Sequence, residues 1–400
     1  MASTTTVNVN IVIFCHSLVS DWNHGNAHFL RGICSELISR GHVVHVYEPE
    51  DSWSYQNMVA DAGTAFLAEF KLAYPMLESR RYRELQIDRA LSKADLVIVH
   101  EWNTPEIIAE IGSFRKRRPI FRLLFHDTHH RAVTVVNSES RIDLSGYDAV
   151  LAYGASLRDL YLENRWHRNV WSWHEAADTR VFRPRTSVKK LYDVVWIGNW
   201  GDDERTEELE EFLIQPIREL CLNAVVYGVR YPPSARRALS EAGIKYGGWL
   251  PNFRVPEIFA RASVTVHVPR RPYVERLPGI PTIRPFEALA CGIPLVSAPW
   301  RDVEELFRKD QDLLFAKNGP DMTAKLATLL DHPDLANDMS RSGRQRIDQL
   351  HTCAHRVDAL FEILDNLRRR LNGRRIRIPE FGEMGLSRAS SSVPAPPPQL

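Results

Sequence analysis

The stretch IRPFEALACGIPLVS, residues 283–297, decides the fold. Pro285 suits the first position of a helix, and Gly292 followed by Pro294 ends that helix after about two turns. The residues after this stop, PLVSA, have the apolar character of a short buried strand. A short helix followed directly by a buried strand is typical of a layered α/β domain.

A single carboxylate, Glu287, lies in the first turn of this apolar helix. Its charge complements the helix dipole, which is worth about 0.3–1 kcal/mol. That role explains the acid but not its apolar surroundings, where a carboxylate is costly unless hydrogen-bond donors reach it. The vicinal hydroxyls of a sugar are suitable donors. Glu287 therefore has a structural interpretation and a ligand-binding one.

Strand and helix patterns alternate along most of the chain, in two series. The first includes NIVIF, HVVHVYEP, ADLVIVHEW and PIFRLLFHD, and the second includes YDVVWIGNW, NAVVYGV, SVTVHV and IPLVSA. This alternation predicts two parallel sheets, with a boundary at about residue 186, where Pro and basic residues interrupt the pattern. We predict an α/β fold with two Rossmann-like domains, residues 1–186 and 187–345, that face a ligand-binding cleft.

The end of the chain follows neither series. Residues 341–371 have the pattern of a long amphipathic helix, and we expect its part from 346 to 371 to pack across the two domains. Residues 372–400 cannot build a core, so a disordered tail is predicted. Six arginines lie between Arg368 and Arg377. They fit either a weak peripheral contact with an anionic membrane or a solvated helix end.

Composition excludes several classes of function. The 51 Lys and Arg nearly balance the 50 Asp and Glu, so nucleic acid is not expected as a partner. The five cysteines are scattered, which favours neither a disulfide framework nor a zinc site. The first residues lack the basic front and long apolar stretch of a signal peptide, and no long apolar run is present, so a cytoplasmic protein is expected.

Several segments, read in order, resemble the landmarks of a known enzyme family. They are FHD, YDAVLAYGASLRDLYLE, DTRVFRP, GGWLPNFRVPEIFARASVTVHVP, RPFEALACGIPLVS and DVEELF. This order resembles the group 1 glycosyltransferases, and the C-terminal half is most similar to their CgeB-like branch. The resemblance implies the two-domain GT-B architecture, a nucleotide diphosphate sugar as donor, transfer with retention of anomeric configuration, and no cofactor or metal ion.

The resemblance also implies how the donor is held. Glu287 receives the ribose hydroxyls of the donor, because a carboxylate accepts both hydrogen bonds of a diol. The family has a second Glu eight positions earlier, where this chain has Gly279. Glu275, Thr282 and Arg284 lie on the same approach to the helix, and Glu275 or Arg284 could supply the replacement contact.

The donor diphosphate needs positive charge or backbone donors. Related enzymes use a basic pair just after the first strand of the second domain, and here the corresponding places hold Asn199 and Arg205. The alternative for Arg205 is a solvated residue at a helix start, paired with Asp202 or Glu208. Arg284, next to a helix N-terminus, is a further phosphate candidate. Arg270 and Arg271 lie near another strand end.

On the first domain, the resemblance assigns the catalytic role to His126, which faces the donor sugar near the bond that breaks. The alternative is a histidine satisfied within its loop. The nearby His129 and His130 form a weak metal pattern without a third ligand, and no metal site is predicted.

The turn after the first strand resembles the family's glycine-bearing loop, which approaches the phosphates and the acceptor. Gly25 permits close backbone approach, and His24, Asn26 and Trp22 are candidates to face the acceptor. The acceptor itself, whether glycan, lipid-linked or small molecule, is left open. So are two other functions: a sugar-nucleotide binder without activity, and a nucleotide-sugar epimerase.

Overall fold

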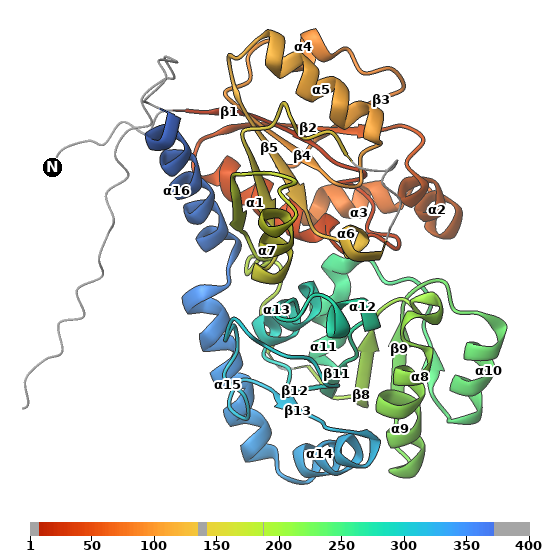
Figure 1. Ribbon diagram of the computed structural model, residues 1–400. Helices are drawn as coiled ribbons and strands as arrows, with labels where there is room; N and C mark the ends of the chain where they lie inside the picture. Colours follow the sequence, from red (N-terminus) through yellow and green to blue (C-terminus); the bar gives the residue numbers. More distant parts are fainter. Residues whose placement is uncertain (1–7, 135–141, 187, 372–400) are drawn as a thin grey trace, which may run out of the picture.

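The computed structural model describes residues 8–134, 142–186 and 188–371. They form two α/β domains, each built on one parallel sheet with helices on both faces (Figure 1). The predicted disordered tail, residues 372–400, lies outside the described residues, as do Arg374, Arg375 and Arg377.

The first domain contains a seven-stranded sheet in the order β3-β2-β1-β4-β5-β6-β7. Its strands are β1 Asn10–Phe14, β2 Val43–Pro49, β3 Ser79–Tyr82, β4 Leu96–His100, β5 Arg122–Asp127, β6 Ala149–Ala152 and β7 Val170–Ser172. β4, β5 and β6 are buried along their whole length, as expected for central strands covered on both faces. The order changes direction between β1 and β4, and ligands bind parallel sheets at such a switch point.

The helices of the first domain follow these strands. They are α1 Ala27–Ser39, α2 Trp53–Ala62, α3 Phe66–Ala73, α4 Ile87–Leu91, α5 Pro105–Arg117, α6 Arg131–Thr134 and α7 Ala155–Glu163.

The second domain contains a six-stranded sheet in the order β10-β9-β8-β11-β12-β13. Its strands are β8 Tyr192–Ile197, β9 Ala224–Tyr227, β10 Lys245–Tyr246, β11 Ala262–His267, β12 Leu295–Ser297 and β13 Leu314–Phe315. Its helices are α8 Thr206–Leu209, a π turn at Glu210–Ile214, α9 Gln215–Glu219, α10 Pro233–Glu241, α11 Val255–Ala260, α12 Arg271–Glu275, α13 Ile283–Cys291 and α14 Gly319–Asp331.

The segment that decides the fold has the predicted structure. Helix α13 ends at Gly292, whose φ of 68° is the left-handed conformation common after helices, and strand β12 follows. Every residue of α13 except Arg284 is buried, so this short helix lies within the domain rather than on its surface.

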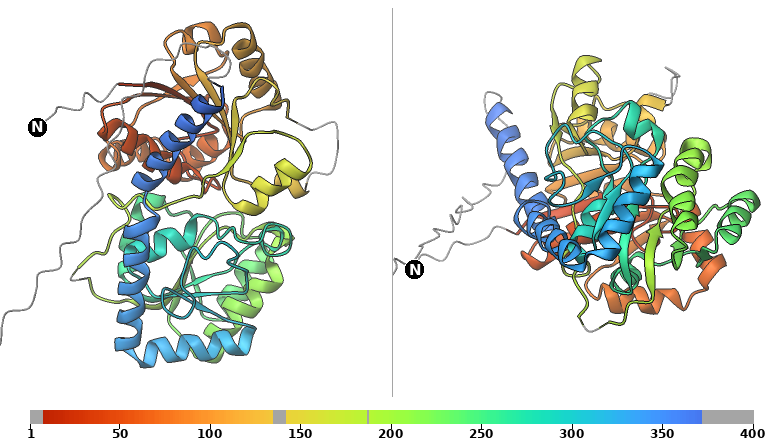
Figure 2. Two further views of the ribbon diagram at one scale, coloured as in Figure 1. Left: turned by 60° about the vertical axis from the view of Figure 1, so that its left-hand side comes forward. Right: turned by 90° about the horizontal axis from the view of Figure 1, so that it is seen from below.

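Two helices end the described chain, where the sequence predicts one. Helix α15, Pro333–Leu350, packs against α13 in the second domain, and α16, Cys353–Leu371, packs against α1 in the first. Figure 2 shows the two helices running from one domain to the other along one side of the molecule. The predicted helix over 341–371 is therefore interrupted at residues 351–352.

The break between α15 and α16 lies against the other crossing between the domains. The amide of Ala177 donates to the carbonyl of His351 at 3.0 Å, and the amide of Cys353 donates to the carbonyl of Ala177 at 3.0 Å. The side chain of Arg356 adds a bond from Nε to the carbonyl of His174 at 2.8 Å. These long-range bonds use backbone groups that a continuous helix would pair internally.

The domains are closed onto each other by apolar contacts as well as polar ones. The ring of Phe66 on α3 lies 5.1 Å from the ring of Trp249 in the second domain, measured between ring centroids.

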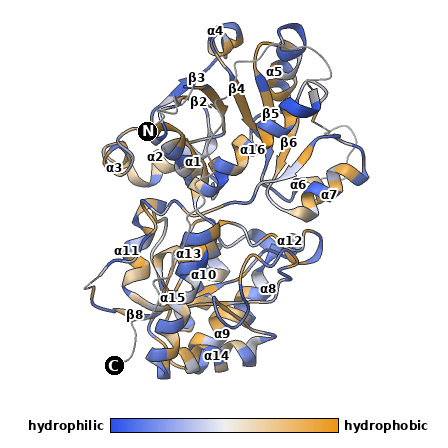
Figure 3. Cartoon of the chain, turned by 90° about the vertical axis from the view of Figure 1, so that its left-hand side faces the viewer, coloured by the Kyte–Doolittle hydropathy of each residue, from blue (hydrophilic) through white to orange (hydrophobic). Residues whose placement is uncertain are grey.

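Figure 3 shows the first sheet's central strands, such as β4 and β6, largely in the colours of hydrophobic residues. Among the described residues, no helix is long and apolar enough to cross a membrane.

Candidate functional site

A cavity of about 200 Å³, the central cavity, lies between the domains where the strands of both sheets end. Its wall from the first domain includes the loop between β1 and α1, and its wall from the second includes the loops after β8 and β11 and the start of α13. The cavity brings together seven predicted site residues: His24, Gly25, Asn26, Asn199, Arg205, Thr282 and Arg284.

Arg205 is the most unusual cation of the cavity. Its guanidinium donates to three carbonyls, those of Asn199, of Val268 at 2.9 Å and of Trp200 at 3.3 Å. Among the described residues it has no carboxylate partner, and burial lowers its pKa to about 9. A half-buried cation without a counterion is costly, and an anionic ligand would compensate it.

Asp202 and Glu208, the two acids that the sequence offers as partners for Arg205, pair with other arginines. Asp202 accepts two bonds from Arg230, both at 3.0 Å. Glu208 accepts from Nε of Arg271 at 2.8 Å, and Arg271 does not line the central cavity. The helix-start pairing considered as the alternative for Arg205 is therefore absent from the described residues.

Two further arginines line the same wall, each with one acid. Arg270 donates to Glu204 at 2.7 Å, and Arg284 pairs with Glu287. The wall from the second domain therefore gathers three guanidinium groups where parallel strands end.

Asn199 and Thr282 are two further residues that line the cavity on the side of the second domain. The side-chain nitrogen Nδ2 of Asn199 donates to Oδ1 of Asn23, on the first domain, at 2.6 Å. The side-chain oxygen of Asn199 accepts from the backbone amide of Val229 at 3.0 Å. Thr282 has a φ of 60°, a strained conformation for a β-branched residue, immediately before α13. Such strain is often stored at ligand sites.

Glu287 does not reach the cavity surface. Its side chain is fully buried, and its carboxylate contacts His28 on α1, Arg284, and Nδ2 of Asn252, the last at 2.7 Å. Although burial acts to raise the pKa of Glu287, the charges of His28 and Arg284 hold it below the ordinary value. Sequence reasoning found the acid but neither His28 nor Asn252.

His126 is also buried and does not line the cavity. Its ring lies 4.8 Å from that of Trp173 and 5.8 Å from that of Phe29, between centroids. Neither ring nitrogen has a hydrogen-bond partner among the described residues, and burial lowers the pKa of His126 to about 3. The histidine is therefore neutral and lies beneath the floor of the site in this closed arrangement.

Gly279, in place of the family's second Glu, lies outside the cavity lining as well. Its φ is 91°, and a side chain here would approach Val303 and Glu304. Glu304 accepts from the amide of Ala155 at 2.8 Å and pairs with His174 at 2.9 Å, so it joins the two domains. Glu275, a candidate replacement, is exposed at the end of α12.

A buried acid that sequence reasoning missed lines the central cavity. Glu175 follows β7 and accepts a hydrogen bond from Nδ2 of Asn26 at 2.9 Å. Burial, and next the charge of Glu287, raise the pKa of Glu175 to about 8. Its position just after a strand, at the edge where the predicted residues cluster, is the signal that could have found it.

No metal site is evident in the described segments. No group of three or more His, Cys, Asp or Glu is arranged there to hold an ion. The rings of His129 and His130 lie against each other, with centroids 4.0 Å apart.

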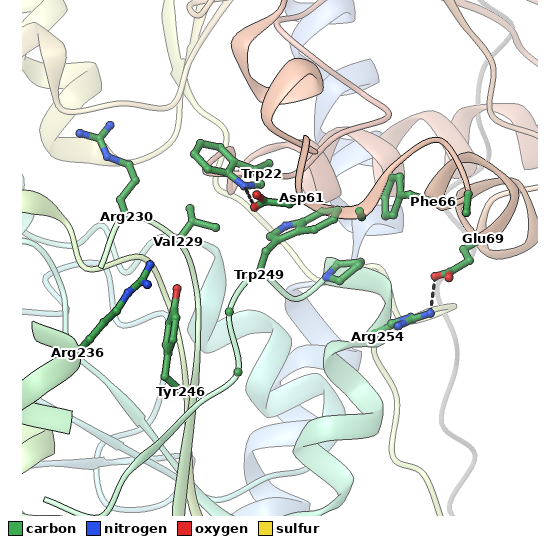
Figure 4. A pocket seen from close by; sticks show the side chains of 15 residues that line it. Trp22, Asp61, Phe66, Glu69, Val229, Arg230, Arg236, Tyr246, Trp249 and Arg254 are labelled. Carbon is green, nitrogen blue, oxygen red and sulfur yellow. Dashed lines mark hydrogen bonds and ion pairs between the residues drawn. The ribbon is translucent and has the colours of Figure 1, made fainter. Parts of the chain in front are cut away.

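A larger hollow of about 610 Å³, the side pocket, lies beside the central cavity. Figure 4 shows Trp22, Asp61 and Phe66 of the first domain opposite Tyr246 and Trp249 of the second. Nε1 of Trp22 donates to Asp61 at 2.6 Å, so Trp22 contributes to this pocket and not to the central cavity. Backbone of Gly247 and Gly248, with Arg230 and Arg236, completes the wall of the second domain. The hydrogen bond between Asn23 and Asn199 lies between the two hollows.

Comparisons with known proteins agree with this architecture. Residues 205–362 match the family model described as glycosyl transferase-like. Sucrose-phosphate synthase from Thermosynechococcus elongatus superposes with a TM-score of 0.60 at 14% identity, covering 90% of this chain and 100% of the synthase. The chain therefore has the GT-B fold of these glycosyltransferases.

Two other solved glycosyltransferase structures have the same fold. HepE of Anabaena in complex with UDP has a TM-score of 0.63 at 13% identity, covering 89% of this chain and 100% of HepE. An α-glucosyltransferase in complex with UDP and a 13-mer DNA has a TM-score of 0.61 at 13% identity, covering 90% and 100%. No curated protein sequence matches the chain.

The family match covers only part of the site. It includes Arg205, Arg270, Arg284 and Glu287, on the second domain. The first-domain wall and His126 lie outside the matched residues.

Proposed function

We propose that the protein is a glycosyltransferase that moves a sugar from a nucleoside diphosphate donor to an acceptor hydroxyl, with retention of anomeric configuration. The observation that carries the proposal is the half-buried guanidinium of Arg205, which has no carboxylate partner among the described residues. A diphosphate would supply the missing negative charge. Arg270 and Arg284 line the same wall and would share its charge.

In this proposal the arginines, rather than a resident metal ion, stabilise the leaving diphosphate. Arginine is suited to this role, because its planar fork binds two phosphate oxygens at once and stays charged at neutral pH. The C-terminal half's resemblance to the CgeB-like branch is consistent with it.

Retention is proposed from the family resemblance, and the acids of the cavity bear on its route. Glu175 is the only carboxylic acid that lines the described part of the central cavity. A covalent double displacement, as in retaining glycoside hydrolases, uses a pair of carboxyl groups. A front-face route, in which the leaving phosphate assists the acceptor hydroxyl, needs no such pair and relies on positioning and charge stabilisation.

The side pocket is proposed to hold the nucleoside base. Its tryptophans offer flat apolar faces, and backbone near Gly248 lies at its wall, where an added Cβ would meet no atom within 4 Å. Open backbone beside aromatic rings suits a planar base that both stacks and forms hydrogen bonds. UDP is the nucleotide to test first, because HepE and the α-glucosyltransferase were solved with it.

Titration calorimetry with UDP and UDP-glucose tests the proposal through Arg205→Gln. We expect at least a tenfold loss of affinity, since a charged hydrogen bond to a ligand is worth about 1.5–3 kcal/mol. Arg237→Gln, a change of an exposed arginine on α10, is the matched control and should bind as the native protein does. Unchanged UDP affinity in Arg205→Gln would refute the diphosphate assignment. Anomeric proton NMR of the product then checks retention.

A further inference from the structure

The two walls of the central cavity differ in charge. The wall from the second domain carries Arg205, Arg270 and Arg284. The wall from the first domain is formed by Asn, His, Trp, Thr and Tyr side chains, the backbone of Gly25 and one acid, Glu175, which accepts a hydrogen bond from Asn26; it has no Lys or Arg among its described residues. An anion is therefore favoured on one side only.

Several polar atoms of the first-domain wall are buried without a partner in the described part of the chain. They include Nε2 of His24, Oδ1 of Asn26 and Nδ1 of His129. His24 is 2% exposed and Asn26 is 7% exposed. Buried polar atoms are nearly always hydrogen-bonded, and leaving one unpaired costs about 1–3 kcal/mol. Three such atoms on one wall indicate a place where ligand atoms complete the bonding.

The chemistry of these atoms restricts the ligand. The amide nitrogen of Asn26 donates one hydrogen to Glu175, at 2.9 Å, and the unpartnered atom is its oxygen, which can only accept. A carboxylate or a doubly ionised phosphate has no proton to donate to it. An ammonium group has protons, but the three arginines across the cavity would repel it. Uncharged hydroxyl groups donate to the amide oxygen and either donate to or accept from a neutral imidazole.

His24 and His129 are neutral, so neither attracts an anionic ligand to the first-domain wall. Burial holds the pKa of His24 well below its ordinary value, and burial followed by the charge of His130 lowers the pKa of His129 to about 2. Trp102 lines the same wall and offers an aromatic surface on which the C–H groups of a sugar ring can pack.

We propose that the first-domain wall of the central cavity binds an uncharged, polyhydroxylated acceptor, a carbohydrate unit, through His24, Asn26 and His129. This inference deepens the proposed function, on which it rests, by naming the acceptor class. The cavity of about 200 Å³ suits one sugar ring at a time. The sugar hydroxyls face the unpartnered atoms, and the diphosphate faces the arginines.

Saturation-transfer NMR on the full chain with saturating UDP tests the inference. The probes are methyl α-D-glucopyranoside and methyl α-D-galactopyranoside, compared with glucuronate, glucose 6-phosphate and glucosamine. We expect transfer to at least one neutral glycoside and little to the charged sugars. Asn26→Ala and His129→Ala should each weaken the bound glycoside at least fivefold, while UDP affinity by calorimetry stays within twofold. His332→Ala, a change of an exposed histidine before α15, is the control.

The outcomes separate this inference from the donor assignment. If UDP binds and no neutral glycoside does, or the charged sugars bind as well as the neutral ones, the acceptor class is refuted while the donor proposal stands. If glycosides bind and depend on Asn26 and His129 but UDP does not bind, the donor proposal fails and the sugar site is supported. Glycoside binding that both variants retain would show that only water completes the bonding of the three atoms.

Discussion

The carboxylate of Glu287, on the second domain, contacts Nδ1 of the His28 imidazole, on the first. The same oxygen, Oε1, also accepts from Asn252, and the other oxygen pairs with Arg284. Both oxygens of this buried carboxylate are thus engaged, so a ribose diol cannot reach both while these contacts persist. If Glu287 receives the donor, binding must first separate His28 from it, which requires the domains to move apart.

His28→Ala should therefore uncouple stability from donor binding. Removing a buried hydrogen bond to a charged group costs about 1.5–3 kcal/mol of unfolding free energy. UDP affinity, however, should increase, because the competing contact from the first domain is gone. Denaturant unfolding and titration calorimetry measure the two quantities. Weaker UDP binding at unchanged stability would contradict a competing role for His28.

Glu287→Gln should weaken binding of a UDP-sugar by about 1.5–3 kcal/mol, because a charged acceptor of hydroxyl bonds becomes a neutral amide. Calorimetry with UDP-glucose gives the affinity, and circular dichroism shows that the fold persists. Glu257→Gln, at an exposed position on α11, is the matched control. Unchanged donor affinity would leave Glu287 with a purely structural role.

Trp249→Ala should distinguish the contribution of the nucleoside base to UDP affinity from that of the diphosphate. We expect UDP affinity to fall by about 1–3 kcal/mol, as base stacking on an aromatic ring is lost, with pyrophosphate affinity unchanged. Trp249→Phe keeps a ring and should recover part of the loss. Equal losses for UDP and pyrophosphate would instead indicate that the ring only holds the domains together.

Glu175 should make stability depend on pH. The unfolded chain loses the proton of this acid near its ordinary pKa of 4.5, whereas the folded protein keeps it up to about pH 8. The free energy of unfolding therefore contains a contribution that is full below pH 4.5 and is lost as pH rises to about 8.

Glu175→Gln lacks this titration, so its stability relative to the native protein should increase from pH 4.5 to pH 8 and then level off. The groups that act on Glu175 are Asn26, Glu287 and Arg284, and all remain in the variant. Urea unfolding at a series of pH values measures the difference. A constant difference, equal to that of Glu163→Gln at the exposed end of α7, would exclude a raised pKa.

His126 should affect turnover more than donor affinity if its nitrogens act on the reacting sugar once the domains open. Two variants distinguish chemistry from packing. His126→Phe fills the space against Trp173 and Phe29, whereas His126→Ala leaves a cavity. A low turnover in both, with unchanged UDP affinity, supports a catalytic role. Native turnover in His126→Phe would assign the residue to the core.

Much of the fold follows from local patterns. The end of α13 is set by Gly292 and Pro294, and the buried strands by short apolar runs, so both are readable in the sequence. The break between α15 and α16 is not, because bonds to Ala177, far away in the chain, cause it. A helical pattern alone carries no information about such partners.

The candidate site likewise contains residues that the sequence predicts and contacts that it does not. Asn199 and Arg205 were found through the family resemblance, which implies a basic pair just after the first strand of the second domain. The apolar surroundings of Glu287 could be predicted, but its partners His28 and Asn252 could not, since they reach the carboxylate through the tertiary structure. The same holds for the unpartnered state of Arg205, which becomes visible only when Asp202 and Glu208 are seen with other arginines.

The position of helix α16 in the chain determines the order in which the two domains can complete their folding during synthesis. The helix comes from the end of the described chain, yet its apolar residues belong to the core that contains β1 and α1: Val357, Leu360, Phe361, Ile363, Leu364 and Leu367. The first domain therefore emerges from the ribosome before the second but is completed only after it. Until residues 353–371 emerge, the nascent chain exposes the part of α1 that α16 will cover, a surface that chaperones can bind.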